Sequence, residues 1–191
     1  MSGLRKIISG AQTGVDMAAL DSAISRLVFC WGGWVPKGRT NEDGRIPESY
    51  FDVDRFDCGL QEHPGSSRNY RARTIKNIQS SDATMILRIS GAGRVLGPGT
   101  KLTIATLQKM DKPYRLFDPS KIYTVPKAAQ WICQTKDLVT LNVAGSRESK
   151  DPGIYKATRI FLDSVFSYVF MYQRWGIRIW APQKMSSRVS R

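Results

Sequence analysis

Three loops rich in small residues, at positions 10–14, 91–100 and 145–149, lie where the chain passes from a predicted strand to a predicted helix. In an open α/β sheet, loops at the carboxyl ends of the strands line the ligand crevice. Glycine lets backbone N–H groups approach an anion, and the helix that follows adds its positive end. The loops contain no G-x-G-x-x-G or Walker motif, and turn geometry alone would also account for their glycines. Three such loops in one chain nevertheless favour a phosphate-bearing ligand.

The first of these loops also carries polar side chains. Thr13 and Asp16 form an [ST]-x-x-[DE] pair at the start of a predicted helix, which is typical of a capping box. Capping explains these two residues as well as ligand binding does. Gln12 has no capping role and is therefore the better candidate for a ligand contact.

Basic and hydroxyl side chains occur in two other loops. Lys37 and Arg39 belong to a Pro-Lys-Gly-Arg segment whose side chains could meet phosphate or remain solvated. Thr100 could cap a helix that begins at Lys101 or donate to a phosphate oxygen. One hydroxyl rarely does both.

The residues give little support for catalysis. His63 is the only histidine, and no serine or aspartate motif marks a triad around it. Cys30, Cys58 and Cys133 lack the spacing of a zinc site, and Cys30 and Cys133 lie in apolar contexts typical of a core. We therefore name no catalytic residue and no metal ligand.

The elements that must position these loops alternate between strand and helix. Alternation of this kind implies parallel strands joined by right-handed crossovers. We predict a single α/β domain with a Rossmann-like, open, mostly parallel sheet and helices on both faces, spanning residues 1–172, followed by a basic tail over residues 173–191. The expected strands are 4–9, 29–34, 83–89, 114–118 and 138–143, and the expected helices are 15–27, 69–80, 101–109, 126–135 and about 152–172. Residues 37–65 read mostly as loop.

The last predicted helix is apolar nearly all round, with Ile160 and Phe161 on one broad face and Phe170 beyond it. Such a helix must be covered on more than one side. Either it is fully internal, or a partner subunit covers its second side, and we expect a homo-oligomer.

Composition and charge limit the class of protein further. The 191 residues are 41% hydrophobic, which excludes an intrinsically disordered chain. No apolar run is long enough for a membrane span, and no signal peptide is evident. Because the cysteines are few, odd in number and far apart, we expect no disulfide framework and a reducing, cytoplasmic location.

The net charge of +13 is concentrated in segments 63–81, 83–110 and 173–191, which are basic and contain no acidic residue. An anionic partner is therefore expected. Nucleic acid could be contacted through the tail.

Five motifs occur in the order found in the putative molybdenum carrier protein family, which this sequence resembles over residues 7–172. They are ISGAQTGVD (8–16), GWVPKGR (33–39) with EDG (42–44), SDATMIL (81–87), GPGT (97–100), and NVAGSRES (142–149) with PGIY (152–155). The family belongs to a Rossmann-like superfamily that also holds the LOG-type, lysine-decarboxylase-like phosphoribohydrolases and DNA-processing proteins.

The resemblance implies a binder of a nucleotide or a pterin phosphate, with molybdenum cofactor (molybdopterin) as the suggested cargo. The LOG-type hydrolases carry a PGGxGT-x-x-E loop whose glutamate assists catalysis, whereas here Thr100 is followed by Lys101, Leu102 and Thr103. A non-catalytic carrier is therefore favoured over the two alternatives, a nucleotide phosphoribohydrolase and a nucleic-acid-binding protein. Carried over by motif, the binding candidates are Gly10, Gln12, Thr13, Gly14, Asp16, Lys37, Gly38, Arg39, Gly97, Gly99, Thr100, Ser146, Arg147 and Glu148.

Overall fold

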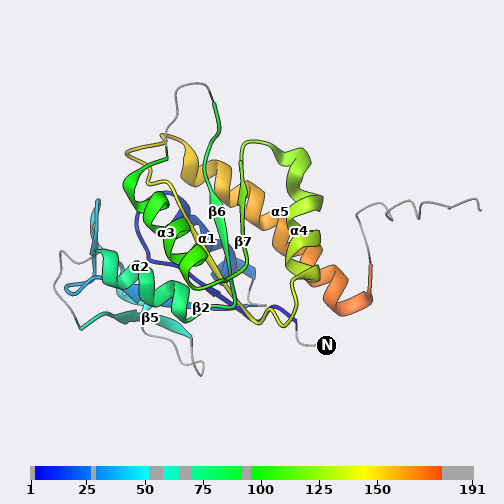
Figure 1. Cartoon of the computed structure of the whole chain (residues 1–191), viewed down its shortest axis with the longest axis horizontal. Coiled ribbons are helices and arrows are strands. Elements are labelled where there is room, and N and C mark those ends of the chain that lie inside the picture. The colour runs from blue at the N-terminus through cyan, green and yellow to red at the C-terminus, as the bar shows by residue number, and fades with distance from the viewer. Residues whose placement is uncertain (1–2, 27–28, 52–57, 65–69, 92–95, 178–191) are drawn as a thin grey trace, which may run out of the picture.

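A parallel β-sheet lies at the centre of the structure, a computed structural model that describes residues 3–26, 29–51, 58–64, 70–91 and 96–177 (Figure 1). Its strands follow the order β5-β2-β1-β8-β6-β7, and every neighbouring pair is parallel. The strands are β1 (Lys6–Ile8), β2 (Cys30–Val35), β5 (Gly59–Glu62), β6 (Ala83–Leu87), β7 (Tyr114–Phe117) and β8 (Thr140–Gly145).

Helices cover both faces of this sheet, as predicted. One face carries α1 (Val15–Arg26), α4 (Val125–Gln134) and α5 (Ile154–Trp175), and the other carries α2 (Tyr70–Gln79) and α3 (Pro98–Lys109). In Figure 1, α2 lies beside α3 and α4 lies beside α5. The prediction of a Rossmann-like α/β domain is confirmed.

Strand β6 shows why two helical layers are needed. All five of its residues are buried, and successive side chains of a strand point to opposite faces. Met85 and Leu87 join the larger core, whereas Ile86 packs with Ile78 of α2 and Leu107 of α3 in a second cluster. A strand buried on both faces reads in sequence as a continuous apolar run, which is why it was predictable.

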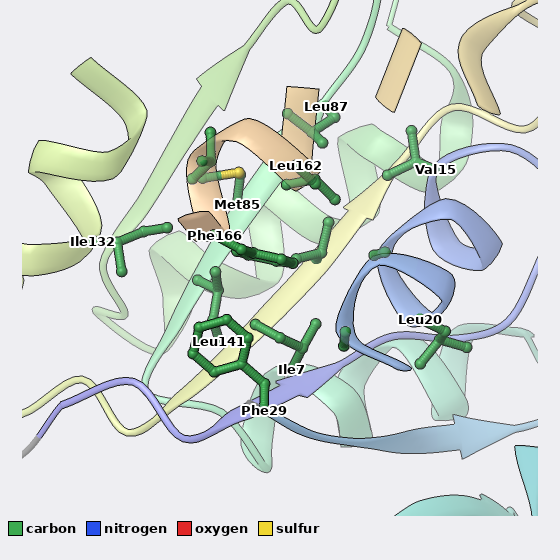
Figure 2. Close-up of a cluster of buried hydrophobic side chains, with 14 of the residues drawn as sticks. Ile7, Val15, Leu20, Phe29, Met85, Leu87, Ile132, Leu141, Leu162 and Phe166 are labelled. Atoms are coloured by element: carbon green, nitrogen blue, oxygen red, sulfur yellow. The ribbon is translucent and has the colours of Figure 1, made fainter. Parts of the chain in front are cut away.

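The larger core lies between the sheet and the layer of α1, α4 and α5 (Figure 2). Ile7, Leu141 and Met85 contribute from adjacent parts of the sheet. Phe166 of α5 meets Phe29 edge to face, with ring centroids 5.2 Å apart. Each side chain of this size stabilises the fold by roughly 1.5–3 kcal/mol when fully buried.

Helix α5 is covered on both flanks by its own chain. It packs against α1 and α4 as well as against the sheet, which accounts for its wide apolar surface. Ile160, predicted to lie on the broad buried face, is instead 50% exposed. The helix ends at Trp175, three residues later than predicted, and the tail from residue 178 onward lies outside the described residues.

The segment read mostly as loop contains more structure than predicted. Strand β5 adds an edge to the sheet, and the hairpin of β3 (Thr40–Asn41) and β4 (Gly44–Arg45) is followed by the 3-10 helix η1 (Glu48–Tyr50). A second 3-10 helix, η2 (Ile122–Thr124), precedes α4. Strand β5 escaped prediction because Leu60 is the one aliphatic side chain among its four residues, so it shows no apolar alternation.

The expectation of no disulfide is wrong, because Cys30 and Cys58 are joined. Parallel pairing of β2 with β5 aligns Gly32 with Gly59, and this alignment brings the two cysteine Cα atoms to 5.3 Å. The spacing of 28 residues gave no hint of this contact, because it depends on the strand that the sequence did not reveal. Cys30 and Cys133, read as core residues, are each half-buried.

Among the described residues, none of the helices combines the length and apolar character that crossing a membrane requires.

Candidate functional site

The loops after β1 and β8 are in direct contact at the carboxyl edge of the sheet. The N–H of Val15 donates to the carbonyl of Ser146 at 3.1 Å, and the N–H of Ser146 donates to Leu87 of β6 at 3.2 Å. Gly14 has a φ of +79°, and a Cβ at this position would lie 2.6 Å from the Ser146 carbonyl oxygen. Glycine is the residue that tolerates both conditions, so Gly14 lets the two loops touch.

Two adjoining pockets open at this edge, over β8, where α1 and α3 leave toward opposite faces of the sheet. The inner pocket reaches α2, and its lining includes Gly10, Gln12, Asp16, Tyr70, Arg73, Thr103 and Asn142. The outer pocket is lined by Gly97, Pro98, Gly99, Thr100, Gly145, Ser146, Arg147, Lys150 and Asp151. Gly99, Thr100, Gly145 and Arg147 line both pockets, so one extended ligand could occupy both.

Arg73 of α2 is the buried cation of the inner pocket. It is 6% exposed, and its Nη1 donates to the carbonyl oxygen of Gly10. A Cβ at Gly10 would collide with this guanidinium, so glycine is required here for the side chain to reach the sheet edge. Burial lowers the pKa of Arg73, and the nearby carboxylate of Asp16 opposes that shift. An arginine stays protonated even so.

Asp16 is the carboxylate that faces Arg73 in this pocket. One of its oxygens accepts the N–H of Gln12 at 3.3 Å, whereas the predicted capping box would pair it with the N–H of Thr13. Burial raises the pKa of Asp16, and the positive charge of Arg73 opposes this effect. One carboxylate thus faces two guanidinium groups, those of Arg73 and Arg147.

A second guanidinium, that of Arg147, lies at the wall shared by the two pockets. The Cζ atoms of Arg147 and Arg73 lie 5.1 and 5.5 Å from the centroid of the Tyr70 ring. Aromatic faces attract cations, so Tyr70 holds two arginines near each other. Because like charges repel, the charge of Arg147 lowers the pKa of Arg73 further. This arrangement favours an anion.

Gln12 places an unused amide beside these charges. Its side chain is buried at 3% exposure, yet neither Nε2 nor Oε1 has a hydrogen-bond partner among the described residues. The Nε of Arg73 is also buried and has no hydrogen-bond partner among the described residues. Leaving buried polar atoms unpaired costs roughly 1–3 kcal/mol each. A ligand with both a donor and an acceptor would satisfy the amide, as expected for a residue predicted to contact ligand.

The amino end of α3 contributes backbone donors. The helix begins at Pro98 rather than at Lys101, so Thr100 lies inside its first turn and does not cap it. Gly97 is the N-cap residue, and because glycine has no side chain, the N–H groups of the first turn receive no side-chain cap from it. No described atom lies within 4 Å of where a Cβ of Gly97 or Gly99 would be, so internal packing does not require glycine there. Uncapped N–H groups at a helix start bind anions readily.

The structure brings eight of the fourteen predicted residues to the pockets. They are Gly10, Gln12, Asp16, Gly97, Gly99, Thr100, Ser146 and Arg147. The other six do not line either pocket. Among them, Gly14 joins the two loops, Thr13 donates to Glu42 at 2.6 Å, and Glu148 accepts the N–H groups of Gly153 and Tyr155 at the start of α5.

Residues 37–39 form a separate network. The N–H of Gly38 and the Nε of Arg39 donate to Glu62 at 3.0 and 3.3 Å. Arg39 also pairs with Glu48 and lies over the ring of Phe51. Lys37 is exposed. Residues 37–39 therefore lie apart from both pockets, and their contact with phosphate stays a prediction.

Several pocket residues were missed by sequence reasoning. Tyr70 and Arg73 lie in the basic segment 63–81, which was flagged for charge alone. Their side chains reach the pocket only because α2 crosses the sheet toward β6. Asn142 and Glu42 occur within the quoted motifs but were assigned no role. Asn142 donates to Thr84 at 3.2 Å.

No described group of three or more histidine, cysteine, aspartate or glutamate residues is arranged to hold a metal ion. His63 lies away from both pockets, with its ring centroid 6.2 Å from that of Trp34.

Comparison with known families identifies the chain. A family model described as the circularly permutated YpsA SLOG family matches residues 7–166. The chain belongs to this SLOG family. Its sequence is also 40% identical to that of a protein from Syntrophus aciditrophicus SB whose crystal structure is described as that of a putative molybdenum carrier protein. The match covers 86% of this chain and 96% of that one, and the two structures superpose with a TM-score of 0.71. No curated protein gives a significant match. The resemblance predicted from the motifs is confirmed, and the SLOG match covers the loops that form both pockets.

Proposed function

We propose that this protein is a non-catalytic binder or carrier of a phosphate-bearing small molecule, held in the two pockets. The observation that carries the proposal is the buried amide of Gln12, which has no described partner, beside the guanidinium of Arg73. Buried polar groups in folded proteins are nearly always hydrogen-bonded, so an unpaired buried amide calls for a partner such as a ligand or an ordered water.

Each part of the pockets has a role in this proposal. The phosphate lies at the amino end of α3 and at Arg147, on the wall that both pockets share. Arg73 adds positive charge from within. Gln12 pairs with a polar edge of the rest of the ligand, because a carboxamide offers one donor side and one acceptor side.

Molybdenum cofactor is the first candidate ligand, and a nucleotide is the second. The name of the 40% identical protein suggests the cofactor. Both ligands join a phosphate to a nitrogen heterocycle with amide-like edges, which suits Arg147 and Gln12 respectively. The pocket chemistry favours this shared class, and the experiment separates its members.

The test is to purify the protein and measure bound pterin, nucleotide and molybdenum, then to titrate the emptied protein with molybdopterin and with nucleoside monophosphates by calorimetry. Arg147→Gln should weaken binding by roughly tenfold or more, since hydrogen bonds to charged groups contribute about 1.5–3 kcal/mol. Arg39→Gln is the matched control, because Arg39 pairs with Glu48 and Glu62 outside the pockets. A protein that is isolated empty and binds no member of the class at micromolar concentration would contradict the proposal.

Hydrolysis of nucleotides is the weaker alternative. Thr103 stands where the LOG-type loop has its glutamate, and the carboxylate of Glu148 is engaged at the start of α5. Release of free base from a nucleoside monophosphate, lost in Glu148→Ala, would favour the hydrolase over the carrier.

Three broader expectations belong to this proposal. They are a cytoplasmic location, assembly as a homo-oligomer, and contact with nucleic acid through the tail over residues 173–191. Cell fractionation, light scattering and salt-dependent nucleic-acid binding test them in turn.

A further inference from the structure

The carboxylate of Glu42 is held by three side chains at the entrance of the proposed site. It accepts hydrogen bonds from Thr13 Oγ1 at 2.6 Å, from Ser149 Oγ at 2.9 Å and from Arg147 Nη1 at 3.0 Å. Thr13 belongs to the loop after β1, and the other two donors belong to the loop after β8. Glu42 therefore bridges the two loops that form the edge of the site.

The donors around Glu42 are also suited to a phosphate. Two hydroxyl groups and one guanidinium converge on a pair of anionic oxygens, and the same groups bind phosphate oxygens in proteins. Arg147 is the decisive member, because it lines both pockets and is also the ion-pair partner of Glu42. An anion that enters beside Arg147 therefore competes with Glu42 for the guanidinium.

The segment that carries Glu42 is lightly attached. Glu42 and Asp43 lie at the turn between the two-residue strands β3 and β4, and residues 42–45 are exposed. Asn41 Nδ2 donates to the carbonyl of Ala11 at 3.2 Å, and Ile46 is fully buried just beyond the hairpin. Exposed backbone with few buried apolar contacts opens at low free-energy cost. The hairpin can thus leave the loops while Ile46 stays anchored.

We propose that Glu42 is an internal anion that the phosphate of the ligand displaces, so that the β3–β4 hairpin is a latch on the site. This inference rests on the proposed function and adds its regulation. In the closed state, Glu42 neutralises Arg147 and joins the two loops. In the bound state, the phosphate takes over Arg147, and the hairpin is released from Thr13 and Ser149.

A latch and a positioning carboxylate predict opposite results for Glu42→Gln. Removing the negative charge of a latch removes a competitor, so binding strengthens. Removing a carboxylate that holds Arg147 in its binding geometry weakens binding instead.

The experiment uses inorganic pyrophosphate as the probe and titrates the full-length chain by calorimetry. Glu42→Gln should bind pyrophosphate roughly twofold to fivefold more tightly than the wild type, the range expected for release of a partly exposed ion pair. Glu48→Gln is the matched control, because Glu48 lies on the same segment but pairs with Arg39 and Arg45. The gain should disappear in the double variant Glu42→Gln, Arg147→Gln.

Hydrogen exchange gives a second readout on the unmodified protein. Saturating pyrophosphate should speed amide exchange in residues 40–45 if the hairpin is released, and slow it if Glu42 only positions Arg147. Equal or weaker binding by Glu42→Gln, slower exchange, or a gain that survives in the double variant overturns the latch alone. If neither the wild type nor Glu42→Gln binds pyrophosphate, the latch is overturned, whereas the proposed function is decided separately by the titrations with molybdopterin and nucleoside monophosphates.

Discussion

At the scale of single residues, the inner pocket combines groups that a stable interior would avoid. Gln12 buries an amide with no described partner, and Arg73 buries a guanidinium whose Nε is also unpaired. Burial opposes ionisation of both Arg73 and Asp16, whose pKa values are shifted in the directions that disfavour charge. These costs reduce stability, and we expect ligand binding to recover part of them.

Gln12→Met tests directly whether the buried amide lowers stability and strengthens ligand binding. Methionine has a similar length and no strong hydrogen-bonding group, so the substitution removes the unpaired amide while filling its space. We expect the free energy of unfolding of the ligand-free protein to stay equal or to rise by about 1–2 kcal/mol. Affinity for the ligand should fall, because its polar edge loses both partners. Urea unfolding and calorimetry measure the two effects.

Asn77→Leu is the matched control for Gln12→Met. The side chain of Asn77 is also buried and also lines the inner pocket, but its Oδ1 and Nδ2 are each paired with the backbone of Trp34, at 2.7 and 3.1 Å. Its replacement should lower stability. A loss of more than about 2 kcal/mol in Gln12→Met as well would show that its amide has a partner within the protein, against our interpretation.

At the scale of elements, the disulfide ties together the beginnings of two neighbouring strands, β2 and the edge strand β5. Cys30 starts β2, and Cys58 directly precedes β5. The bond closes the part of the chain that contains both Glu42 and Glu48. A cross-link over 28 residues restricts the unfolded chain and stabilises the fold by about 2–4 kcal/mol.

Thiol counting and unfolding experiments test the disulfide. Under denaturing conditions, the unreduced protein should show the thiol of Cys133 and no other, and the reduced protein should show all three cysteines. Reduced wild type and the double variant Cys30→Ser, Cys58→Ser should unfold at the same urea concentration, below that of the oxidised protein. In the folded state, Cys133 should react slowly, because burial raises its pKa to about 12. Three thiols in protein purified and air-oxidised in the absence of reductant would contradict the bond.

The elements that could be predicted from sequence are those whose burial leaves a local pattern. The apolar run of β6 indicated a buried parallel strand, and the periodicity of α5 indicated a long helix. Strand β5 shows no apolar pattern in the sequence, because it lies at the edge of the sheet and Leu60 is its one aliphatic residue. The Cys30–Cys58 contact depends on β5, so it was hidden for the same reason.

The candidate site was predictable to the extent that backbone loops form it. Glycines after β1 and β8, and at the start of α3, indicated the carboxyl edge of the sheet correctly. Arg73 and Tyr70 could not be assigned, because α2 reaches this edge only through the crossover from β5 to β6. Arg39 is the opposite case, because the sequence of its loop suggested a phosphate contact. In the structure its side chain pairs with Glu48 and Glu62, outside both pockets.

At the scale of the whole molecule, the charge of +13 divides between partners of different size. Arg73 and Arg147 lie within the fold, at pockets suited to one small anion. Arg178, Lys184, Arg188 and Arg191 lie in the tail, which has no acidic residue. Deleting residues 178–191 should therefore leave pyrophosphate affinity unchanged, because the proposed binding groups remain.

The same deletion should weaken binding to single-stranded nucleic acid. Because each neutralised phosphate contributes about 0.7 to the salt slope, removing these four cations should reduce the slope by about three. A full-length variant with the four basic residues replaced by glutamine controls for chain length and should behave as the deletion does. Electrophoretic mobility shifts and calorimetry over a range of salt concentrations separate the two partners. Loss of pyrophosphate binding on deletion would instead make the tail part of the small-molecule site, and the charge would then serve one partner rather than two.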